Sequence, residues 1–393
     1  MPYTIEPWKK GKLPSLHELV TPLQDELKTM APLKSQGNRP LQIEFEHQLN
    51  ALIYFHLEEH TSGTHLLQVL KEDSFVRSVI APPDGLKKST FFEAINSRGL
   101  EQLLYLFERL QAKAAKILPS AHPKLGDLVA IDGSLIDACL SMYWADYRDG
   151  SKKAKIHLGF DINRSIPCKI FLTDGKGDER PFVNKILSPG QTGVMDRYYQ
   201  CHKRFDAWHR EEKHYLCRIK AGTNKTLIKA NEVKPGGIVF YDAVVLLGTP
   251  GVNQTEEPLR VVGYRIGSVS YWVATDRYDL SAEQIAMIYK LRWEIEKFFG
   301  WWKRHLRVYH LIARSEYGLM VQILAGLITY LLLAIYCHQK HNEKVSIQRV
   351  RELRIKIQNE ARNFAACTVH TDRENDLTAG NIKDQWEYLY AKT

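Results

Sequence analysis

Apolar residues recur at helical spacing through residues 1–120, and no strand-rich run interrupts them. Residues 42–57, "QIEFEHQLNALIYFHL", carry apolar side chains every three or four positions, which is typical of an amphipathic helix. After a turn that begins at 82, Thr90 followed by Glu93 predicts the start of a short helix, and Gly99 predicts its end. A longer helix is predicted at 100–117. We therefore expect this part of the chain to be mostly helical.

From residue 127 the pattern changes to short apolar runs separated by turn-forming residues. In chain order we predict a strand at "DLVAID", a hairpin of "AKIHLGFDI" and "CKIFLTDG", a helix at "ERPFVNKIL", a strand at "TGVMD", a helix at 201–212 and a strand at "HYLCRIK". Three antiparallel strands followed by helix, strand, helix and strand is the order of a ribonuclease-H-like α/β fold. A second strand-rich stretch, 221–276, follows as an insertion, and helical periodicity returns at 281–306, where Ser281 can cap the first turn.

These changes of pattern divide the chain into five parts. They are a helical N-terminal DNA-binding region (1–120), the first part of the ribonuclease-H-like core (121–220), the β-strand insertion (221–276), the second part of the core with the catalytic helix (277–345) and a helical C-terminal tail (346–393). DNA binding is assigned to the first part because a short helix, a glycine turn and a second helix, with Lys87, Lys88 and Arg98 nearby, suit a helix-turn-helix reader. A plain helical packing module explains the same pattern equally well.

Residues 318–337, "GLMVQILAGLITYLLLAIYC", contain no charged side chain. Twenty such residues are long enough to cross a bilayer, but a helix buried on all sides in a large core has the same composition. Gln322 and two tyrosines dilute the run, and a strongly charged helix comes directly before it. We favour burial, and we expect no association with a membrane.

The stretch 289–303, "YKLRWEIEKFFGWWK", combines charge with many apolar side chains. At about 100° per residue, Tyr289, Arg292, Glu296 and Lys303 fall on one narrow face of a helix. The opposite face holds an apolar stripe that would dock onto a core: Ile288, Leu291, Ile295, Phe299 and Trp302. Solubility alone does not explain why these four polar residues share one narrow face of the helix.

Three carboxylates stand out by their positions. Asp132 and Asp196 each end an apolar strand, and Glu296 lies on the polar face of the helix. Neighbouring carboxylates in a partly desolvated site repel one another, and divalent cations relieve that repulsion. Mg²⁺ prefers oxygen ligands, and two such ions can activate an attacking oxygen and stabilise a leaving oxygen at phosphorus.

Each of these acids also has an ordinary interpretation. A lone aspartate after a strand is commonly a turn or cap residue, and a glutamate four residues after an arginine is commonly a surface ion pair. Rival acids lie nearby: Asp137, Asp161, Asp174 and Asp178. The residues alone do not choose among them.

Composition adds two constraints. The chain has 54 Lys and Arg against 45 Asp and Glu, a formal charge of +9, which suggests an anionic partner such as nucleic acid. Its six cysteines, 139, 168, 201, 217, 337 and 367, form no C-x-x-C pair, so a disulfide framework or metal ribbon is not expected and a reducing cytoplasm fits. The first residues, "MPYTIEPWKKGK", show no apolar signal-peptide core.

Residues 289–303 match Tyr-x-x-Arg-x-x-x-Glu-x-x-x-x-x-x-Lys without a gap. This signature resembles that of bacterial insertion-sequence transposases of the four-type family, and the likeness extends over roughly 125–310, with acids in the expected strand contexts and a β-strand insertion before the third acid. The resemblance implies a DDE transposase with Asp132, Asp196 and Glu296 as catalytic and metal-binding residues. Two Mg²⁺ ions, for which Mn²⁺ would substitute, are implied as cofactors.

The resemblance also implies what the chain binds. Tyr289, Arg292 and Lys303 would hold phosphates near the cleaved end of the element, and Trp293 and Trp272 are candidates to stack on an extruded base. Packing in the protein interior is the alternative for both tryptophans. The expected partners are double-stranded DNA, both terminal inverted repeats and target, and a second copy of the chain in a dimeric DNA complex. The expected location is the cytoplasm, on the nucleoid.

Three other functions remain open at this point. A ribonuclease-H-like nuclease would cut without strand transfer, a non-catalytic DNA-binding protein derived from a transposase would only bind, and a single-span membrane protein would be built around 318–337. Retention of all three acids argues against the non-catalytic binder.

Overall fold

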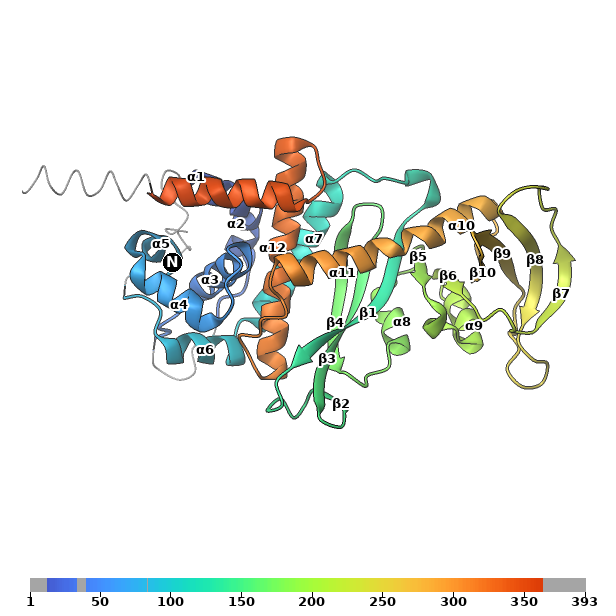
Figure 1. The fold of residues 1–393 in the computed structure, drawn as a ribbon, viewed down its shortest axis with the longest axis horizontal. Coiled ribbons are helices and arrows are strands. Elements are labelled where there is room, and N and C mark those ends of the chain that lie inside the picture. Colours follow the sequence, from blue (N-terminus) through green and yellow to red (C-terminus); the bar gives the residue numbers. More distant parts are fainter. Residues whose placement is uncertain (1–12, 34–39, 83, 363–393) are drawn as a thin grey trace, which may run out of the picture.

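The computed structural model describes residues 13–33, 40–82 and 84–362. The N-terminal sequence without a signal-peptide core (1–12), Cys367 and most of the predicted tail lie outside these residues. Figure 1 shows helices at one end of the molecule and a large sheet that runs through the middle to the opposite end. The described cysteines are all unpaired, as expected.

The N-terminal part is helical. Its elements are α1 (Pro14–Val20), the 3-10 turn η1 (Thr21–Leu23), α2 (Gln24–Thr29), α3 (Phe45–Leu57), α4 (Gly63–Glu72), α5 (Ser74–Ile80), α6 (Lys88–Ser97) and α7 (Leu100–Ile117). The predicted long helix agrees with α7 at both ends. Thr90 does not cap α6, because the helix already begins at Lys88 and the Thr90 hydroxyl donates instead to Oε1 of Gln42, 3.1 Å away. Gly99 adopts φ +88°, a left-handed conformation that glycine tolerates best, and so allows the sharp turn into α7.

The sheet is mixed and contains ten strands. They are β1 (Leu128–Ala138), β2 (Asp146–Arg148), β3 (Ser151–Asp161), β4 (Ile166–Asp174), β5 (Thr192–Met195), β6 (His214–Arg218), β7 (Lys225–Ala230), β8 (Val239–Leu247), β9 (Leu259–Ile266) and β10 (Val269–Thr275). Their order is β2-β3-β1-β5-β6-β10-β9-β8-β7, with β4 also paired to β3. β1, β5 and β6 run parallel, whereas β1, β3 and β4 are antiparallel neighbours. The predicted strands of this region are all present.

Successive side chains of β1 pack into two different hydrophobic cores, one on each face of the sheet. Leu128 and Ala130 belong to the core formed with α7 and the C-terminal helices, whereas Val129 and Ile131 belong to the core beneath the other face of the sheet. This second core holds side chains of α8 (Val183–Ile186) and α9 (His202–Arg210). Because successive side chains of a strand point to opposite faces, an apolar run of this kind requires helices on both sides.

Strands β7–β10 continue the same sheet, because β10 pairs with β6. A buried ion pair connects them to the next helix. The Arg260 guanidinium makes two contacts with the Asp242 carboxylate, Nε–Oδ1 at 2.9 Å and Nη2–Oδ2 at 2.7 Å, and its Nη1 donates to the Leu280 carbonyl at 2.6 Å. Leu280 directly precedes Ser281, which caps α10 (Ala282–Leu291) as predicted, and Gln284 completes a capping box that was not predicted.

The predicted helix at 281–306 is divided at Arg292. α10 ends at Leu291 and α11 begins at Trp293 and ends at His305. The Arg292 N–H bonds to the Tyr289 carbonyl, and the Ile295 N–H bonds to the Arg292 carbonyl, so the chain tightens to three-residue spacing at this position. In Figure 1 the two helices still follow one line across the sheet.

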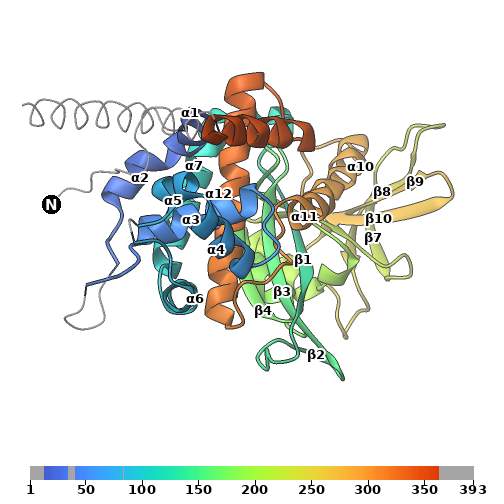
Figure 2. The same cartoon turned by 60° about the vertical axis from the view of Figure 1, so that its left-hand side comes forward.

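The uncharged stretch becomes α12 (Glu316–His341), and its apolar residues are buried. It is the one helix of the described residues long and apolar enough to cross a membrane, but 94% of its most apolar window lies inside the protein. Figures 1 and 2 show α12 between the N-terminal helices and the sheet. It contacts α7, α3 and α6 on one side and β4 on the other. The expectation of burial is therefore confirmed.

A helix begins at 347 and continues to the end of the described residues at 362. Its residues Val350, Leu353 and Ile357 are buried. Arg354 pairs with Glu59 at 2.9 Å, and Glu360 accepts hydrogen bonds from the backbone N–H and the hydroxyl of Ser15. This helix thus packs on the N-terminal helices.

We expect Asp242→Ala to lower the free energy of unfolding by about 3–5 kcal/mol, because it leaves the Arg260 charge buried without its partner. Urea denaturation followed by circular dichroism measures the change. Arg265→Ala, at an exposed position of the same strand β9 as Arg260, is the control and should change stability by less than about 0.5 kcal/mol. Equal effects of the two variants would contradict the importance of the buried pair.

Candidate active site

Asp132 and Asp196 lie side by side at the position where the parallel pairing of β1 with β5 ends. β5 stops at Met195, directly before Asp196, but β1 continues to Ala138, so the prediction that Asp132 ends its strand is wrong. Ile131 of β1 is the register partner of Met195 of β5, so the two aspartates occupy the next positions on adjacent strands, which are about 4.8 Å apart in any sheet. Asp196 caps the 3-10 turn η4 (Arg197–Tyr199) by accepting from the Tyr198 N–H at 2.8 Å. Asp132 accepts from the Gly133 N–H at 2.9 Å. Both carboxylates are therefore held by their own backbone.

Arg292 joins Glu296 to this pair. Its Nη2 lies 2.5 Å from Oε1 of Glu296, one helical turn later, and its Nη1 lies 3.5 Å from Oδ2 of Asp132. Only 10% of the Arg292 side chain is exposed, so the guanidinium is largely withdrawn from solvent. One cation thus reaches two of the three predicted acids.

A fourth carboxylate, Glu179, was not predicted. It accepts a hydrogen bond from the Tyr199 hydroxyl at 2.8 Å and lies 3.4 Å from Nζ of Lys155. A Cβ added to Gly133 would lie 2.4 Å from Cδ of Glu179, so only glycine after Asp132 lets this carboxylate approach. The one signal for Glu179 in the sequence is its position directly after Asp178, which is one of the rival acids. Because no strand ends there, this position alone gave no reason to select Glu179.

Burial raises the pKa of Asp132 to about 7. The neighbouring carboxylates of Glu179 and Asp196 push in the same direction, and the Arg292 guanidinium opposes them. Burial beside these acids also raises the pKa of the Tyr199 phenol well above its usual range, so Tyr199 stays a hydrogen-bond donor to Glu179. The site is therefore poorer in positive charge than its acids require.

These residues fit a hard divalent cation by chemistry, because every nearby acidic group offers carboxylate oxygens. In the described part of the chain, no three His, Cys, Asp or Glu side chains are already arranged to hold a metal ion. Arg292 holds Glu296 and also contacts Asp132.

Tyr289 and Lys303, the other members of the signature, face inward. Tyr289 is 4% exposed, and burial raises the pKa of its phenol to about 12. Lys303 Nζ donates to the Ser134 hydroxyl at 2.6 Å and to the Leu135 carbonyl at 2.5 Å, which ties α11 to β1. Burial lowers the pKa of Lys303. Their predicted contacts with phosphate remain predictions.

The two tryptophans differ in their surroundings. Trp293 is 54% exposed, and the Arg292 guanidinium carbon lies 5.7 Å from its ring centroid. Trp272 is half-buried, packs against Phe240 and Tyr241 and carries Nζ of Lys225 at 4.5 Å over its ring. Trp293 is thus free to stack on a base as the chain stands, whereas Trp272 would first have to lose these contacts.

Three of the rival acids are engaged in ion pairs of their own. Asp137 pairs with Lys153, Asp161 with Arg164, and Asp178 with Arg180. Asp174 caps a turn by accepting from the Lys176 N–H. Each rival acid thus has a local partner within the described residues, as Asp132 and Glu296 have in Arg292.

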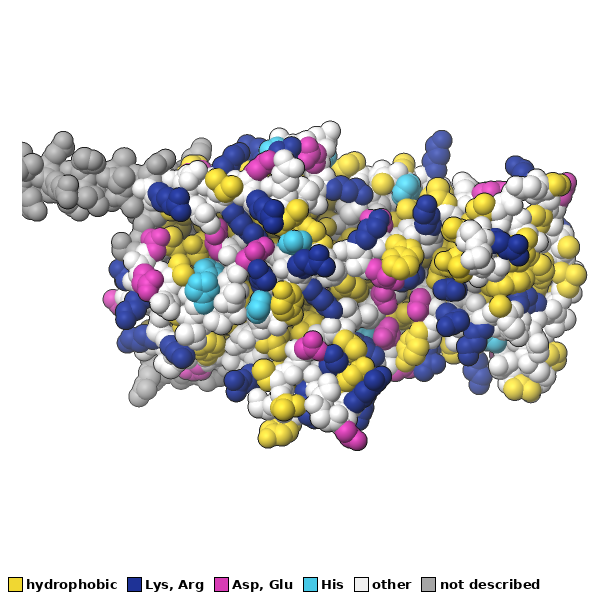
Figure 3. Space-filling view, viewed as in Figure 1, with side chains coloured by type: hydrophobic (Ala, Val, Ile, Leu, Met, Phe, Trp, Pro, Cys, Tyr) yellow, Lys and Arg dark blue, Asp and Glu magenta, His cyan; other side chains and the backbone are white. Residues whose placement is uncertain are grey.

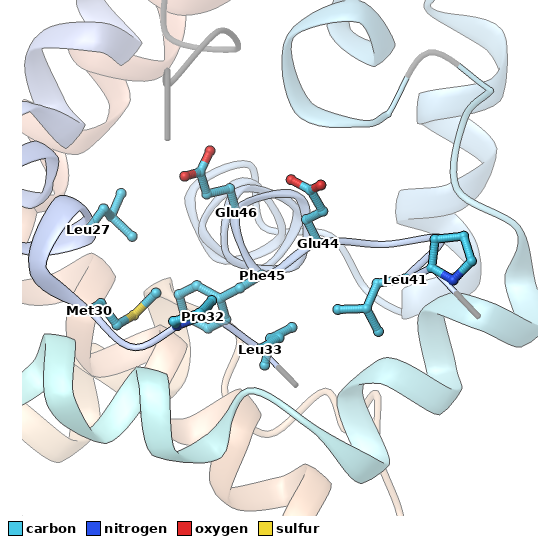
Figure 4. A pocket seen from close by; sticks show the side chains of 9 residues that line it. Leu27, Met30, Pro32, Leu33, Leu41, Glu44, Phe45 and Glu46 are labelled. Carbon is cyan, nitrogen blue, oxygen red and sulfur yellow. The ribbon is translucent and has the colours of Figure 1, made fainter. Parts of the chain in front are cut away.

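Figure 3 shows acidic side chains gathered over the middle of one face, near α11, β1 and β5, with Lys and Arg side chains beside them over α9. A separate apolar pocket of about 300 Å³ lies among the N-terminal helices. Figure 4 shows its lining, which comes from α2, α3 and the segments next to them, and it includes none of the residues described above.

Residues 123–332 match the family model described as "Transposase DDE domain", which covers more than half of the chain. The chain is 27% identical over 216 residues to "Probable transposase for insertion sequence element IS5377" of Geobacillus stearothermophilus, covering 54% of this chain and 57% of that protein. It is 25% identical over 276 residues to a protein of Synechocystis named as a transposase for insertion sequence element IS4SA. This match covers 67% of this chain and 76% of that protein. The match to the Geobacillus protein thus spans little more than half of that relative's length.

Among solved structures, the chain is similar to the piggyBac transposase in a synaptic complex with hairpin DNA. The likeness has a TM-score of 0.44 and 12% sequence identity, and it covers 93% of this chain and 80% of that one.

The raised pKa of Asp132 predicts a pH-dependent stability. Between about pH 4 and about pH 7 the folded protein keeps a proton on this carboxyl that the unfolded chain, at its ordinary pKa of 3.8, has released. The free energy of unfolding therefore falls as pH rises through this window, and Asp132→Asn should remove the loss.

We expect the metal-free Asp132→Asn protein to be more stable than the parent chain at about pH 8, by on the order of a few kcal/mol, and the gap to shrink at about pH 5. Urea denaturation with a chelator present measures both values. Asp137→Asn, whose side chain is 85% exposed, is the control and should change little between the two conditions. A gap of the same size at both pH values would contradict the burial of charge at Asp132.

Proposed function

This chain belongs to the family of transposases with a DDE domain, and from that premise we propose that it moves an insertion sequence by cutting DNA at the ends of the element and joining those ends to target DNA. Two observations support the proposal: Asp132 and Asp196 occupy neighbouring positions on β1 and after β5, and Arg292 contacts both Asp132 and Glu296. The order of strands and helices in 121–220 supports a ribonuclease-H-like core beneath this site.

The three acids are proposed as the catalytic carboxylates and as the ligands of two Mg²⁺ ions, with Mn²⁺ as a substitute. Such ions activate an attacking oxygen and stabilise a leaving oxygen at phosphorus. In the first step a water oxygen would attack the phosphorus at the element boundary. The bond from phosphorus to the 3′ oxygen breaks, and that oxygen leaves as a free 3′-hydroxyl after taking a proton. In the second step this hydroxyl attacks a target phosphorus and displaces another 3′ oxygen.

Arg292 has two roles in this proposal. In the free protein it compensates the Asp132 and Glu296 charges, which would otherwise repel at close range. With DNA bound, its planar guanidinium suits a bidentate contact with a phosphate near the cleaved end, and transfer of Arg292 to that phosphate frees Glu296. Lys303 and Tyr289 would also contact phosphates near the cleaved end of the DNA. Trp293, with Trp272 as a second candidate, would stack on an extruded base.

Further parts of the proposal concern assembly. Two element ends must be held together, so a homodimer is proposed for the DNA complex.

The turn at Gly99 between α6 and α7 supports a helix-turn-helix reader, with exposed Lys87 and Lys88 at the start of α6 available for phosphates. The protein would act in the cytoplasm, on nucleoid DNA.

We expect Asp132→Ala, Asp196→Ala and Glu296→Ala each to lower cleavage of linear DNA carrying terminal repeats by at least roughly 10²-fold, the loss seen when one group that stabilises a transition-state charge is removed. Gel electrophoresis of end-labelled DNA with Mg²⁺ or Mn²⁺ measures cleavage, and fluorescence anisotropy should show that binding largely survives. Glu294→Ala, an acid two residues away that pairs with Lys297, is the control and should cleave normally. Unchanged cleavage in the three variants would refute the site, and cleavage by the parent chain without joined products would favour a nuclease.

Arg292→Ala is expected to weaken binding of the element end, because a phosphate contact is lost. The slope of log K against log salt should fall by about 1. Lys297→Ala, with a side chain 69% exposed on the same helix, is the control and should leave the slope unchanged. Fluorescence anisotropy titrations at four salt concentrations measure this slope for both variants and for the parent chain. An Arg292→Ala protein with the parent slope would show that this guanidinium serves only the acids.

A further inference from the structure

An open groove of about 1080 Å³ begins directly at Asp196. Its lining comes from segments far apart in the chain: η4 and the start of α9, the turn after β6 at 220–224, and the turn after β8 at 248–253. None of the signature residues on α10 and α11 lines it. The groove is thus continuous with the candidate active site but separate from the helix that carries Glu296.

The groove is strongly cationic. Arg180, Arg197, Lys203 and Lys220 line it, and Asp196 is its one acidic lining residue. Arg180 is paired with Asp178. The side chains of Arg197, Lys203 and Lys220 are exposed and have no ion-pair partner within the described ranges. Three free cations around one groove have no structural task, and they favour an anionic ligand.

The rest of the lining suits a nucleic-acid strand. Tyr198 is 52% exposed, and the Arg180 guanidinium carbon lies 5.5 Å from its ring centroid, so a flat aromatic surface stands beside the cations. Gln200 is held in place by the Thr223 hydroxyl, 3.0 Å from its amide nitrogen, and by the Lys220 N–H, 2.9 Å from its amide oxygen. Cations that follow a backbone, together with an exposed ring, are the features with which proteins bind a DNA strand without reading its sequence.

The groove and the signature cations reach different members of the aspartate pair. Arg292 and Lys303 contact β1, at Asp132 and at Ser134, whereas the groove is lined by Asp196, directly after β5, by the start of α9 and by the turn after β6. β1 and β5 are adjacent strands, so each set of positive charge lies beside one of the two aspartates. A DNA strand whose phosphate reacts at the acids continues in both directions from that phosphate and can use both sets.

We propose that this groove binds the sugar–phosphate backbone of target DNA during strand transfer. The inference rests on the proposed function, in which Arg292 and Lys303 hold the element end. The phosphate attacked by the 3′-hydroxyl would then enter along the groove at Asp196, where Arg197, Lys203 and Lys220 can neutralise the phosphates next to it. Donor DNA that flanks the element has the same chemistry and would occupy the groove before cleavage.

The test compares two triple variants of equal charge. Arg197→Gln, Lys203→Gln and Lys220→Gln together remove the free cations of the groove. Lys71→Gln, Lys116→Gln and Lys124→Gln, at exposed positions outside the groove, form the matched control. Thermal unfolding should give both proteins the stability of the parent chain. Two assays are then run. The first measures the joining of pre-cut element ends, which carry a 3′-hydroxyl, to a plasmid. The second measures by fluorescence anisotropy the binding of a duplex that lacks the terminal repeats.

We expect the groove variant to join ends to plasmid on the order of tenfold less than the control, with binding of the pre-cut end unchanged. On the duplex without repeats, its slope of log K against log salt should fall by about 2 to 3, since about 0.9 is lost for each phosphate contact. Cleavage at intact element boundaries should fall as well if flanking DNA uses the groove, whereas a loss confined to joining restricts the groove to target DNA.

Joining and salt slope equal to those of the control would overturn the proposal, and so would a loss of end binding alone. If the parent chain joins no ends at all, the proposed function fails, and the slope on the duplex without repeats still decides whether the groove binds DNA.

Discussion

Carboxylates held close together on adjacent strands repel one another, and the charged groups at this protein's centre are arranged around that repulsion. Asp132 and Asp196 are brought together by the parallel register of β1 and β5, and Glu179 approaches Asp132 over the bare backbone of Gly133. Burial adds to the cost, as the raised pKa of Asp132 shows. The Arg292 guanidinium supplies the compensating charge, and it does so from the position where the helix tightens between α10 and α11.

The surrounding structure holds that guanidinium in place. Lys303 fastens α11 to β1 through Ser134 and Leu135, so the helix lies across the strand that carries Asp132. The start of α10 is anchored to the outer strands by Arg260, which is itself held by the buried Asp242. The buried α12 then joins the sheet to the N-terminal helices.

Local patterns anticipated most of these elements. Most strands of the sheet, α7, the cap at Ser281 and the burial of α12 were predictable, because apolar periodicity and cap residues act over a few positions. The three-residue strand β2 was not predicted. The start of α6 was misplaced, since the Thr90 hydroxyl bonds to Gln42, a partner 48 residues away. The division of the helix at Arg292 was missed for a similar reason, because it accompanies ion pairs with two acids, one of which lies on β1.

The sequence by itself determined which side chains are acidic, which segments are apolar enough to be buried and which signature the chain carries. These properties depend on residue type and on spacing along a single helix or strand. Only the tertiary structure decided that Glu179 lies beside Asp132, that Lys303 and Tyr289 face inward, and that three free cations line a groove at Asp196. Each of these facts is a contact or a shared surface between segments far apart in the chain. Their positions depend on strand register and on how the helices lie across the sheet, and neither can be read from local spacing.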